Sequence, residues 1–484
     1  MSEARGGKAA SSFLFKLIES VGMQLISFVV SVLLARLLTP DDYGILTMLT
    51  VFIALAQVFV TSGLNTALIQ QKDVDDTDLS SVFYVSFGMA AVMYALLYVS
   101  SPAIAAYFEA PALRDTLRVL SLILFAGAFT CVQNAVVARQ MAFRRQMLLS
   151  LAATIASGVV GVSMALAGMG HWALVGQQLV NQFGLAALMF VWIPWRPRLR
   201  FSWKRVARLI RFGWKLLVSS ILDTTYINLR SVVVGKRFNE AALGFYNRGK
   251  QFPELVMNAV NGSISSVMLP VLAESQDDKE RMKQLLRQTI MTSSFLVLPL
   301  MAGLAAAGKP LITLLLTEKW LPCVPFLQIM AMDYALYPVH VANLAAINAQ
   351  GRSDIFLKLE IIKKSYGLAI LAVAVFAFDT VEAIAWTAVI GGCISAFTNG
   401  APNRKLLGYG FLRQLRDLAP SLLLSAAMFL LLSAMNALPL HPAAVLAVQV
   451  AAGAAFYLGL SWLLKLESLR MMTDTLLKLL RKQR

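Results

Sequence analysis

Charged residues are scarce in this chain. Only 14% of its 484 residues are Asp, Glu, Lys or Arg, whereas 58% are hydrophobic. A soluble globular domain usually carries about 25% charged residues, because its surface must be hydrated. The composition therefore excludes a water-soluble globular protein and predicts that lipid surrounds most of the chain.

Cysteine and histidine are also scarce, with three of each. The three Cys lie in separate apolar stretches, which excludes a disulfide framework and a cysteine zinc site, and the three His are equally scattered. The motifs GxxxxGK[ST], HExxH and GxSxG are missing, so ATP hydrolysis and the common hydrolase reactions are not predicted. We therefore expect a protein that is not an enzyme, with no metal site and no cofactor.

The net charge of +17 is the second departure from an average composition. In a soluble protein this excess would indicate nucleic acid, but in a membrane protein Lys and Arg gather in cytoplasmic loops. When the N-terminus is placed inside, most of the Lys and Arg fall on the cytoplasmic side. We therefore expect both termini in the cytoplasm and no nucleic-acid partner.

Long hydrophobic runs dominate what is present. A membrane-spanning helix needs about 20 mostly apolar residues. Runs of this kind predict an all-α integral membrane protein with about 14 transmembrane helices. The fourteen candidate spans are 13–38, 43–69, 79–101, 116–138, 147–168, 172–193, 213–235, 241–271, 286–307, 322–349, 356–378, 380–401, 418–437 and 442–464.

An offset of 200 residues reveals a short internal repeat. It aligns the end of the first predicted span with the end of the seventh, with identities at the pairs Ser31/Ser231, Val32/Val232 and Gly44/Gly244. Six spans return the chain to its starting side, so we predict two six-helix halves around a central cavity, followed by two further helices. The predicted segments are 1–195 and 213–402 for the halves, 196–212 for a basic linker, 403–464 for the extra helices and 465–484 for a basic tail.

The linker and the tail mix aromatic and aliphatic residues with Lys and Arg. This pattern is typical of an amphipathic helix that lies on anionic lipid at the membrane surface. We therefore expect membrane lipids among the partners of the chain, and a topology anchor is the simplest role for both segments.

Charged and polar residues inside predicted spans are costly in lipid and usually face a cavity or a partner. They concentrate on the seventh and eighth spans, with Asn65 added from the second. This clustering predicts a cationic, aqueous cavity that suits an anionic cargo such as a diphosphate. Pairing within a helix and hydrogen bonds between helices are the alternatives. The residues in question are Asp223, Tyr226, Arg230, Arg248, Lys250, Glu254, Asn258 and Asn261.

The tenth predicted span carries Asp333 and His340 on one helical face. A carboxylate and an imidazole inside a span are candidates for proton or cation coupling. A hydrogen bond between helices is the alternative explanation for the same residues.

Two stretches carry a family resemblance. LLARLLTPDDYGILTMLTVFIALAQVF (33–59), followed by SGLNTALIQ (62–70), resembles the opening of Wzx-like polysaccharide transporters, which are flippases of the multidrug/oligosaccharidyl-lipid/polysaccharide exporter superfamily. VGKRFNEAALGFYNRGKQ (234–251) is similar to the matching segment of the second half. The branch of colanic-acid and teichuronic-acid exporters is the most similar.

The resemblance implies transport of undecaprenyl-diphosphate-linked oligosaccharide from the cytoplasmic to the outer leaflet of the bacterial inner membrane, for surface polysaccharides such as exopolysaccharide or lipopolysaccharide. It implies that Arg36, Arg248 and Lys250 hold the diphosphate, and the helical face adds Arg230. A polysaccharide polymerase and an initiating glycosyltransferase are the implied partners of a monomeric protein. A Na⁺ or H⁺ gradient, or consumption of the product, would supply the work. A cation-coupled multidrug exporter, a lipid II flippase and a membrane enzyme remain alternatives.

Overall fold

The computed structural model describes residues 24–473, apart from residues 25, 62, 72 and 276–277, and gives only the backbone for residues 212, 259–271 and 273–274. Nearly all of this described part is helical, and it contains no strand. Nine helices in it are long and apolar enough to cross a membrane. The predicted all-α integral membrane protein is therefore confirmed.

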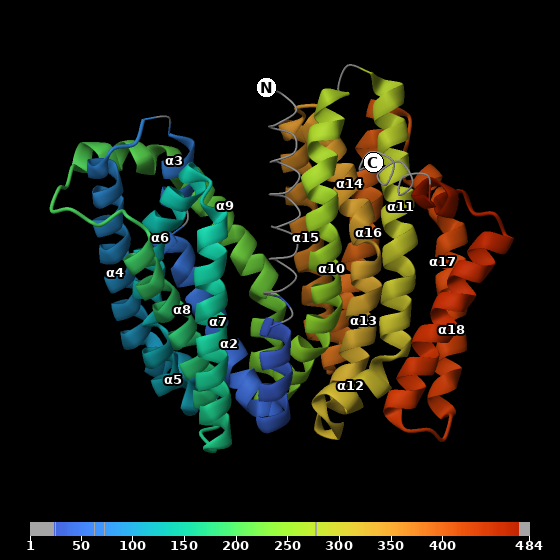
Figure 1. Ribbon diagram of the computed structural model, residues 1–484, viewed down its shortest axis with the longest axis horizontal. Helices are drawn as coiled ribbons and strands as arrows, with labels where there is room; N and C mark the ends of the chain where they lie inside the picture. Colours follow the sequence, from blue (N-terminus) through green and yellow to red (C-terminus); the bar gives the residue numbers. More distant parts are fainter. Residues whose placement is uncertain (1–23, 25, 62, 72, 276–277, 474–484) are drawn as a thin grey trace. The chain divides into compact units, whose positions relative to one another are not determined.

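The chain divides into two compact units, an N-terminal unit (residues 1–244) and a C-terminal unit (residues 245–484). Figure 1 shows the helices of each unit running side by side. The N-terminal unit contains a helix over Ile26–Leu37 and then α2 (Pro40–Thr61), α3 (Leu64–Gln70), α4 (Asp76–Phe108), α5 (Ala112–Leu120), α6 (Ile123–Gln140), α7 (Phe143–Leu166), α8 (Trp172–Trp192), α9 (Trp203–Arg237) and the first turn of α10 (Glu240–Glu274).

The C-terminal unit takes the rest of α10 and continues to the end of the chain. Its further helices are α11 (Lys279–Ala306), α12 (Gly308–Leu316), η1 (Glu318–Cys323), α13 (Val324–Ala335), α14 (Tyr337–Ala349), α15 (Ser353–Ala377), α16 (Val381–Leu407), α17 (Phe411–Ala434), η2 (Met435–Ala437) and α18 (Pro442–Leu463). The second half of the first predicted span coincides with the helix Ile26–Leu37, and residues 13–23 of this span lie outside the described residues. Each of the other thirteen coincides with one helix or with consecutive helices.

Breaks within the predicted spans have local causes. α2 and α3 are separated by Gly63, which has a φ of +84°. Glycine adopts this backbone conformation without steric strain because it has no side chain. A Cβ atom at Gly63 would also lie 2.6 Å from the carbonyl oxygen of Gly213, so the absence of a side chain lets α9 approach closely. α13 and α14 are separated just before Pro338, which starts a helix readily because its missing N–H is not needed there.

The predicted linker 196–212 is not a separate element. Residues 193–202 contain no helix, and α9 then runs without a break from Trp203 to Arg237. The Lys and Arg of its first turns are good helix formers, and the helix passes through Gly213 without breaking. The structure therefore corrects the boundary that separated the linker from the seventh span.

The two compact units do not coincide with the predicted halves. The predicted boundary lies between residues 195 and 213, whereas the units meet at Gly244 and Phe245, because α9 packs on α2, α3 and α4. The division into transport halves stays a prediction. The last predicted segment, 465–484, is described only to residue 473.

The 200-residue repeat has a counterpart in the packing of the N-terminal unit. A Cβ atom at Gly44 would overlap the carbonyl oxygen of Glu240, and a Cβ atom at Gly244 would overlap the carbonyl oxygen of Pro40. Positions 40 and 240 are related by the same offset as 44 and 244. The first turns of α2 and α10 therefore cross reciprocally, as expected for two elements related by an approximate two-fold axis.

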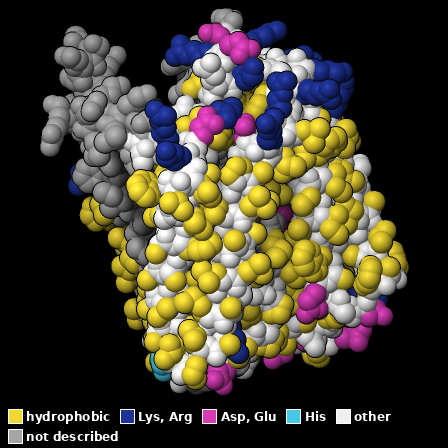
Figure 2. All heavy atoms as spheres, turned by 90° about the vertical axis from the view of Figure 1, so that its right-hand side faces the viewer, with side chains coloured by type: hydrophobic (Ala, Val, Ile, Leu, Met, Phe, Trp, Pro, Cys, Tyr) yellow, Lys and Arg dark blue, Asp and Glu magenta, His cyan; other side chains and the backbone are white. Residues whose placement is uncertain are grey.

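Charge and apolar surface are separated along the helices. On the face drawn in Figure 2, which includes α17 and α18, a broad hydrophobic band lies between an upper end rich in Lys and Arg and a lower end with Asp and Glu. An apolar band of this kind is the surface that faces hydrocarbon in a membrane protein.

Candidate functional site

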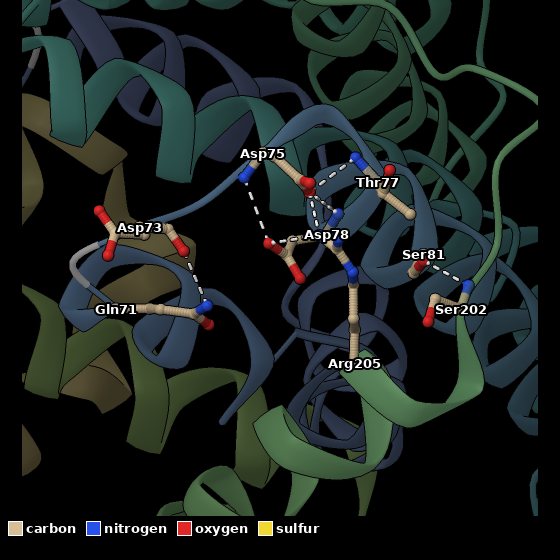
Figure 3. Close-up of polar contacts among 8 residues, drawn as sticks. All are labelled: Gln71, Asp73, Asp75, Thr77, Asp78, Ser81, Ser202 and Arg205. Carbon is tan, nitrogen blue, oxygen red and sulfur yellow. Dashed lines mark hydrogen bonds and ion pairs between the residues drawn. The ribbon is translucent and has the colours of Figure 1, made fainter.

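A cluster of charges joins the start of α4 to the start of α9 in the N-terminal unit (Figure 3). Asp75 precedes α4, and its carboxylate accepts hydrogen bonds from the backbone N–H groups of Thr77 (3.0 Å) and Asp78 (2.9 Å). The guanidinium of Arg205 binds both Asp75 and Asp78, at 3.2 Å from the Oδ2 atom of Asp78. We call Asp75, Asp78 and Arg205 the rim clasp.

The rim clasp is extended by contacts of the loop before α9. The backbone N–H of Ser202 donates to the hydroxyl of Ser81 at 3.0 Å, and the Nη1 atom of Arg198 lies 2.6 Å from a carboxylate oxygen of Asp76. Because these bonds reach across more than 100 residues, they hold α9 against α4 independently of the chain connection.

The pKa of Asp75 is lowered to about 2. The backbone N–H of Asp78 is the main cause, and the guanidinium of Arg205 adds to it, because both stabilise the ionised carboxylate. Asp75 is therefore ionised at every physiological pH.

A polar pocket of about 460 Å³ opens beside the rim clasp. Arg139 lies at its edge and donates to the carbonyl oxygens of Leu68 (2.9 Å) and Gln71, so it caps the end of α3. The lining residues are Gln71, Asp73, Val74, Asp75, Asp78, Arg139, Arg205 and Arg208. With three carboxylates and three guanidinium groups, the pocket has no net charge and offers no clear preference for an anion.

The predicted site residues of the N-terminal unit lie on three helices. Arg36 is exposed near the end of the helix Ile26–Leu37. Asn65 is half-buried on α3, and its Oδ1 atom has no hydrogen-bond partner in the described part of the chain. On α9, Asp223 is exposed while Tyr226 and Arg230 are half-buried, and their spacing places them on one face as predicted.

The predicted cations of α10 point in different directions. Arg248 is only 4% exposed, donates to Gln251, and holds its guanidinium 5.3 Å from the ring centre of Trp320. Lys250 is half-buried two residues later, and two residues correspond to 200° around a helix. The structure therefore uses Arg248 in packing within the C-terminal unit, and its role in binding a diphosphate stays a prediction.

The other predicted residues of α10 differ in environment. Glu254 is half-buried and Asn258 is exposed, whereas the side chain of Asn261 lies outside the described residues. The backbone of α10 is helical through all three positions, so their shared stripe is as predicted.

Asp333 and His340 both face α16, although α13 and α14 divide their span. A Cβ atom at Gly392 would lie 2.5 Å from the Oδ1 atom of Asp333. The Nδ1 atom of His340 lies 3.4 Å from the amide nitrogen of Asn399. A contact between helices therefore accounts for the position of His340, and coupling to an ion stays a prediction for both residues.

A buried amide network was missed by sequence reasoning. Asn343 and Gln414 exchange two hydrogen bonds of 2.8 Å between α14 and α17, and the amide of Asn403 on α16 donates to Asn343 at 2.7 Å. All three side chains are fully buried or nearly so. Asn343 lies within the tenth predicted span. Gln414 lies outside the thirteenth predicted span, which begins at residue 418.

A second missed cluster ties α11 to α17 and to the segment after α18. The Nε and Nη2 atoms of Arg287 donate to the carboxylate of Asp417 at 2.8 and 3.2 Å. Its Nη1 and Nη2 atoms donate to the carboxylate of Glu467, both at 2.7 Å. The Tyr409 hydroxyl also donates to Asp417, at 2.8 Å. The hydrogen bonds from Arg287 lower the pKa of Glu467. Two bidentate pairs on one arginine hold three segments together.

The C-terminal unit also contains an apolar cavity of about 470 Å³. Four helices line most of it: α11, α12, α17 and α18. Representative lining residues are Phe295, Leu300, Leu311, Leu432 and Tyr457. Because its lining is predominantly apolar, such a cavity fits a hydrocarbon chain better than a polar group. Among the described residues, no group of three or more His, Cys, Asp or Glu could hold a metal ion.

Known proteins resemble this chain over most of its length. The polysaccharide biosynthesis protein family matches residues 33–325. The succinoglycan biosynthesis transport protein ExoT of Rhizobium meliloti (strain 1021) is 24% identical over 365 residues, which cover 75% of this chain and 74% of ExoT. The teichuronic acid biosynthesis protein TuaB of Bacillus subtilis (strain 168) is 23% identical over 454 residues, which cover 92% of this chain and 93% of TuaB.

Among solved structures, the lipid II flippase MurJ in an inward closed conformation matches with a TM-score of 0.75, at 14% identity, over 93% of this chain and 98% of MurJ. At this identity the likeness shows the fold alone. The class is therefore a multi-pass helical membrane protein with a transporter fold. The matched residues make up more than half of the sequence, and the chain belongs to the polysaccharide biosynthesis protein family. The resemblance to polysaccharide transporters is confirmed.

Proposed function

We propose that this protein is a flippase that moves undecaprenyl-diphosphate-linked oligosaccharide from the cytoplasmic to the outer leaflet for surface polysaccharide synthesis. The observation that carries the proposal is the match to TuaB over 92% of the chain, in a protein whose helices are built to span a membrane. The name of ExoT, a transport protein of succinoglycan biosynthesis, agrees with transport rather than catalysis.

The chemistry of the cargo explains why such a fold is needed. A sugar head group and two phosphates cannot cross hydrocarbon unshielded, because each uncompensated polar group costs several kcal/mol in an apolar medium, roughly 2–7 for a neutral one. Polar side chains on spanning helices supply partners during the passage. We assign the diphosphate to Arg36, Arg230, Arg248 and Lys250, with Asp223, Tyr226, Glu254, Asn258, Asn261 and Asn65 around the sugar.

The lipid part of the cargo needs a different surface. The apolar cavity between α11, α12, α17 and α18 suits part of a polyprenyl chain. Rocking of repeats around a fixed site is the general mechanism of transporters built this way. We assign coupling to a Na⁺ or H⁺ gradient to Asp333 and His340.

Location and partners follow from the same proposal. The Lys-rich and Arg-rich end of the helices faces the cytoplasm, because positive loops are retained there. Both termini are then cytoplasmic, in the bacterial inner membrane. An initiating glycosyltransferase would act before this monomeric protein, and a polymerase would act after it.

The decisive experiment is deletion of the gene, followed by mass spectrometry of undecaprenyl-linked intermediates. The proposal requires a completed repeat unit that accumulates and stays inaccessible to an external glycosidase. Normal surface glycan without any intermediate would refute it, and raised drug sensitivity would then favour a multidrug exporter. Lethality on depletion, with accumulated lipid II, would favour the peptidoglycan pathway.

Single substitutions test the cationic site. Lys250→Ala should abolish surface polysaccharide at unchanged protein level, whereas Lys309→Ala, at an exposed position of α12, should not. Because Arg248 packs on Trp320, Arg248→Ala must be accompanied by a thermal unfolding measurement. Wild-type polymer from Lys250→Ala would exclude Lys250 from the site.

A further inference from the structure

The first turns of α9 carry a row of cations on one face. The spacing of these residues is four, three and four, which places them within about 60° of arc at 3.6 residues per turn. All of them are exposed. We call this row the basic stripe; it consists of Lys204, Arg208, Arg211 and Lys215.

The opposite face of α9 is docked on the N-terminal unit. Val206 and Leu209 are 0% and 4% exposed. Gly213 lies so close to Gly63 that a Cβ atom would come within 2.8 Å of the Gly63 carbonyl oxygen. Since this face is packed, the basic stripe lies on the side of α9 opposite these contacts, with Arg208 at the border of the polar pocket beside the rim clasp.

Acidic partners are distributed unevenly along this region. Arg198 pairs with Asp76, and Arg205 pairs with Asp75 and Asp78 in the rim clasp. Among the described residues, no carboxylate forms an ion pair within 4 Å of any cation of the basic stripe. Within the part of the chain that the structure describes, the stripe is therefore left without an acidic counterion.

Large apolar side chains lie beside the stripe and fix its surroundings. Trp203, Ile210 and Trp214 are 65%, 41% and 50% exposed, and their spacing of seven and four places them on the neighbouring face of α9. Trp is enriched where hydrocarbon meets head groups, and Lys215 lies 6.0 Å from the Trp214 ring centre. The stripe therefore lies at head-group level rather than in bulk water.

We propose that the basic stripe of α9 is a binding site for the head groups of anionic phospholipids, of the phosphatidylglycerol class. Arg208 and Arg211 offer planar guanidinium groups that match phosphate oxygens, and Lys204 and Lys215 add mobile charges. Each cation near an anionic surface contributes about five-fold in affinity. The inference depends on the protein being embedded in a membrane and not on what it transports.

Quenching of tryptophan fluorescence by brominated lipids tests the site in the full-length protein. In phosphatidylcholine vesicles, brominated phosphatidylglycerol should quench more strongly than an equal fraction of brominated phosphatidylcholine. The variant Lys204→Gln, Arg208→Gln, Arg211→Gln, Lys215→Gln should lose this difference, with a fall of at least ten-fold in relative association. Unchanged quenching by brominated phosphatidylcholine shows that the variant is folded and inserted.

A matched variant keeps the total loss of charge but spares the stripe. Its substitutions fall on exposed cations elsewhere, namely Arg144→Gln, Arg145→Gln, Lys358→Gln and Lys405→Gln. It should retain the preference for phosphatidylglycerol. An equal loss in both variants would overturn the proposal in favour of overall charge. Displacement of phosphatidylglycerol by 1 mol% undecaprenyl diphosphate would also overturn it and assign the stripe to the carrier lipid.

Discussion

The two compact units hold their helices together by different chemistry. In the N-terminal unit, helices meet at glycines, as Gly44 does with Glu240. Charges join α4 to α9 near both ends of α4, through Arg205 in the rim clasp and through Lys236, which pairs with Glu109 at 3.0 Å. In the C-terminal unit, neutral amides of Asn343, Gln414 and Asn403 bind one another inside the helix bundle.

The difference shows what a lipid-embedded helix tolerates. A buried charge loses its hydration and recovers the loss only with several partners, whereas an amide needs one donor and one acceptor. Close approach through glycine needs no polar group at all, because dispersion contacts and backbone proximity suffice. Charged networks therefore belong where water or head groups are near.

The largest effect is expected at the crossing of α2 and α10. Gly44→Val would push a branched side chain into the backbone of Glu240, which cannot rotate away, at a cost of about 3 kcal/mol or more. The thermal unfolding midpoint of the purified protein should fall by several degrees. Gly88→Val is the matched control, because no atom lies within 4 Å of a Cβ there. Equal effects of the two substitutions would contradict the crossing.

The next effect tests the amide network. Asn343→Leu removes the shared partner of Gln414 and Asn403, and each buried group left unpaired costs about 1–3 kcal/mol. The variant should unfold at lower temperature, whereas the double variant Asn343→Leu, Gln414→Leu should recover part of the loss. If the double variant were less stable by the sum of both single losses, the network would not be cooperative.

A smaller effect is expected at the rim clasp. Arg205→Met removes the partner of Asp75 and Asp78, but the arginine side chain is 35% exposed and water screens the pair. The fall in the unfolding midpoint should be smaller than for Asn343→Leu, and 1 M NaCl should lower the stability of the wild type towards that of the variant. Salt should leave the deficit of Asn343→Leu unchanged, and a salt-dependent deficit there would contradict the neutral network.

The smallest effect concerns pH. The pKa of Asp75 falls from its ordinary value of 3.8 to about 2 on folding, so its contribution to stability is complete above about pH 4 and is lost as the pH falls towards 2. The difference in unfolding midpoint between the wild type and Asp75→Asn should shrink over this window. A constant difference from pH 6 to pH 2.5 would show that the Asp75 carboxylate is not held ionised by the fold.

Thirteen predicted spans correspond to helices because hydrophobic length is a property of the chain alone. Positions inside the spans were harder to interpret. The sequence predicts that Arg248 is a cation of the cavity, yet the fold packs it against Trp320, which lies 72 residues further along the chain. The sequence does not predict that Gln414 is buried, because this residue precedes the apolar run of α17 by one turn. It is buried because α14 packs against it and Asn343 accepts its hydrogen bond.

The sequence by itself determined that the chain spans a membrane with helices, which end is basic, and which family it belongs to, because composition, run length and local motifs carry that information. Tertiary structure decided which polar residues meet. Arg205 is committed to the rim clasp and the basic stripe is not, although all five are Lys or Arg within one twelve-residue segment. The reason is geometric, since whether a side chain on a helix finds a partner depends on which face of that helix a neighbouring helix covers.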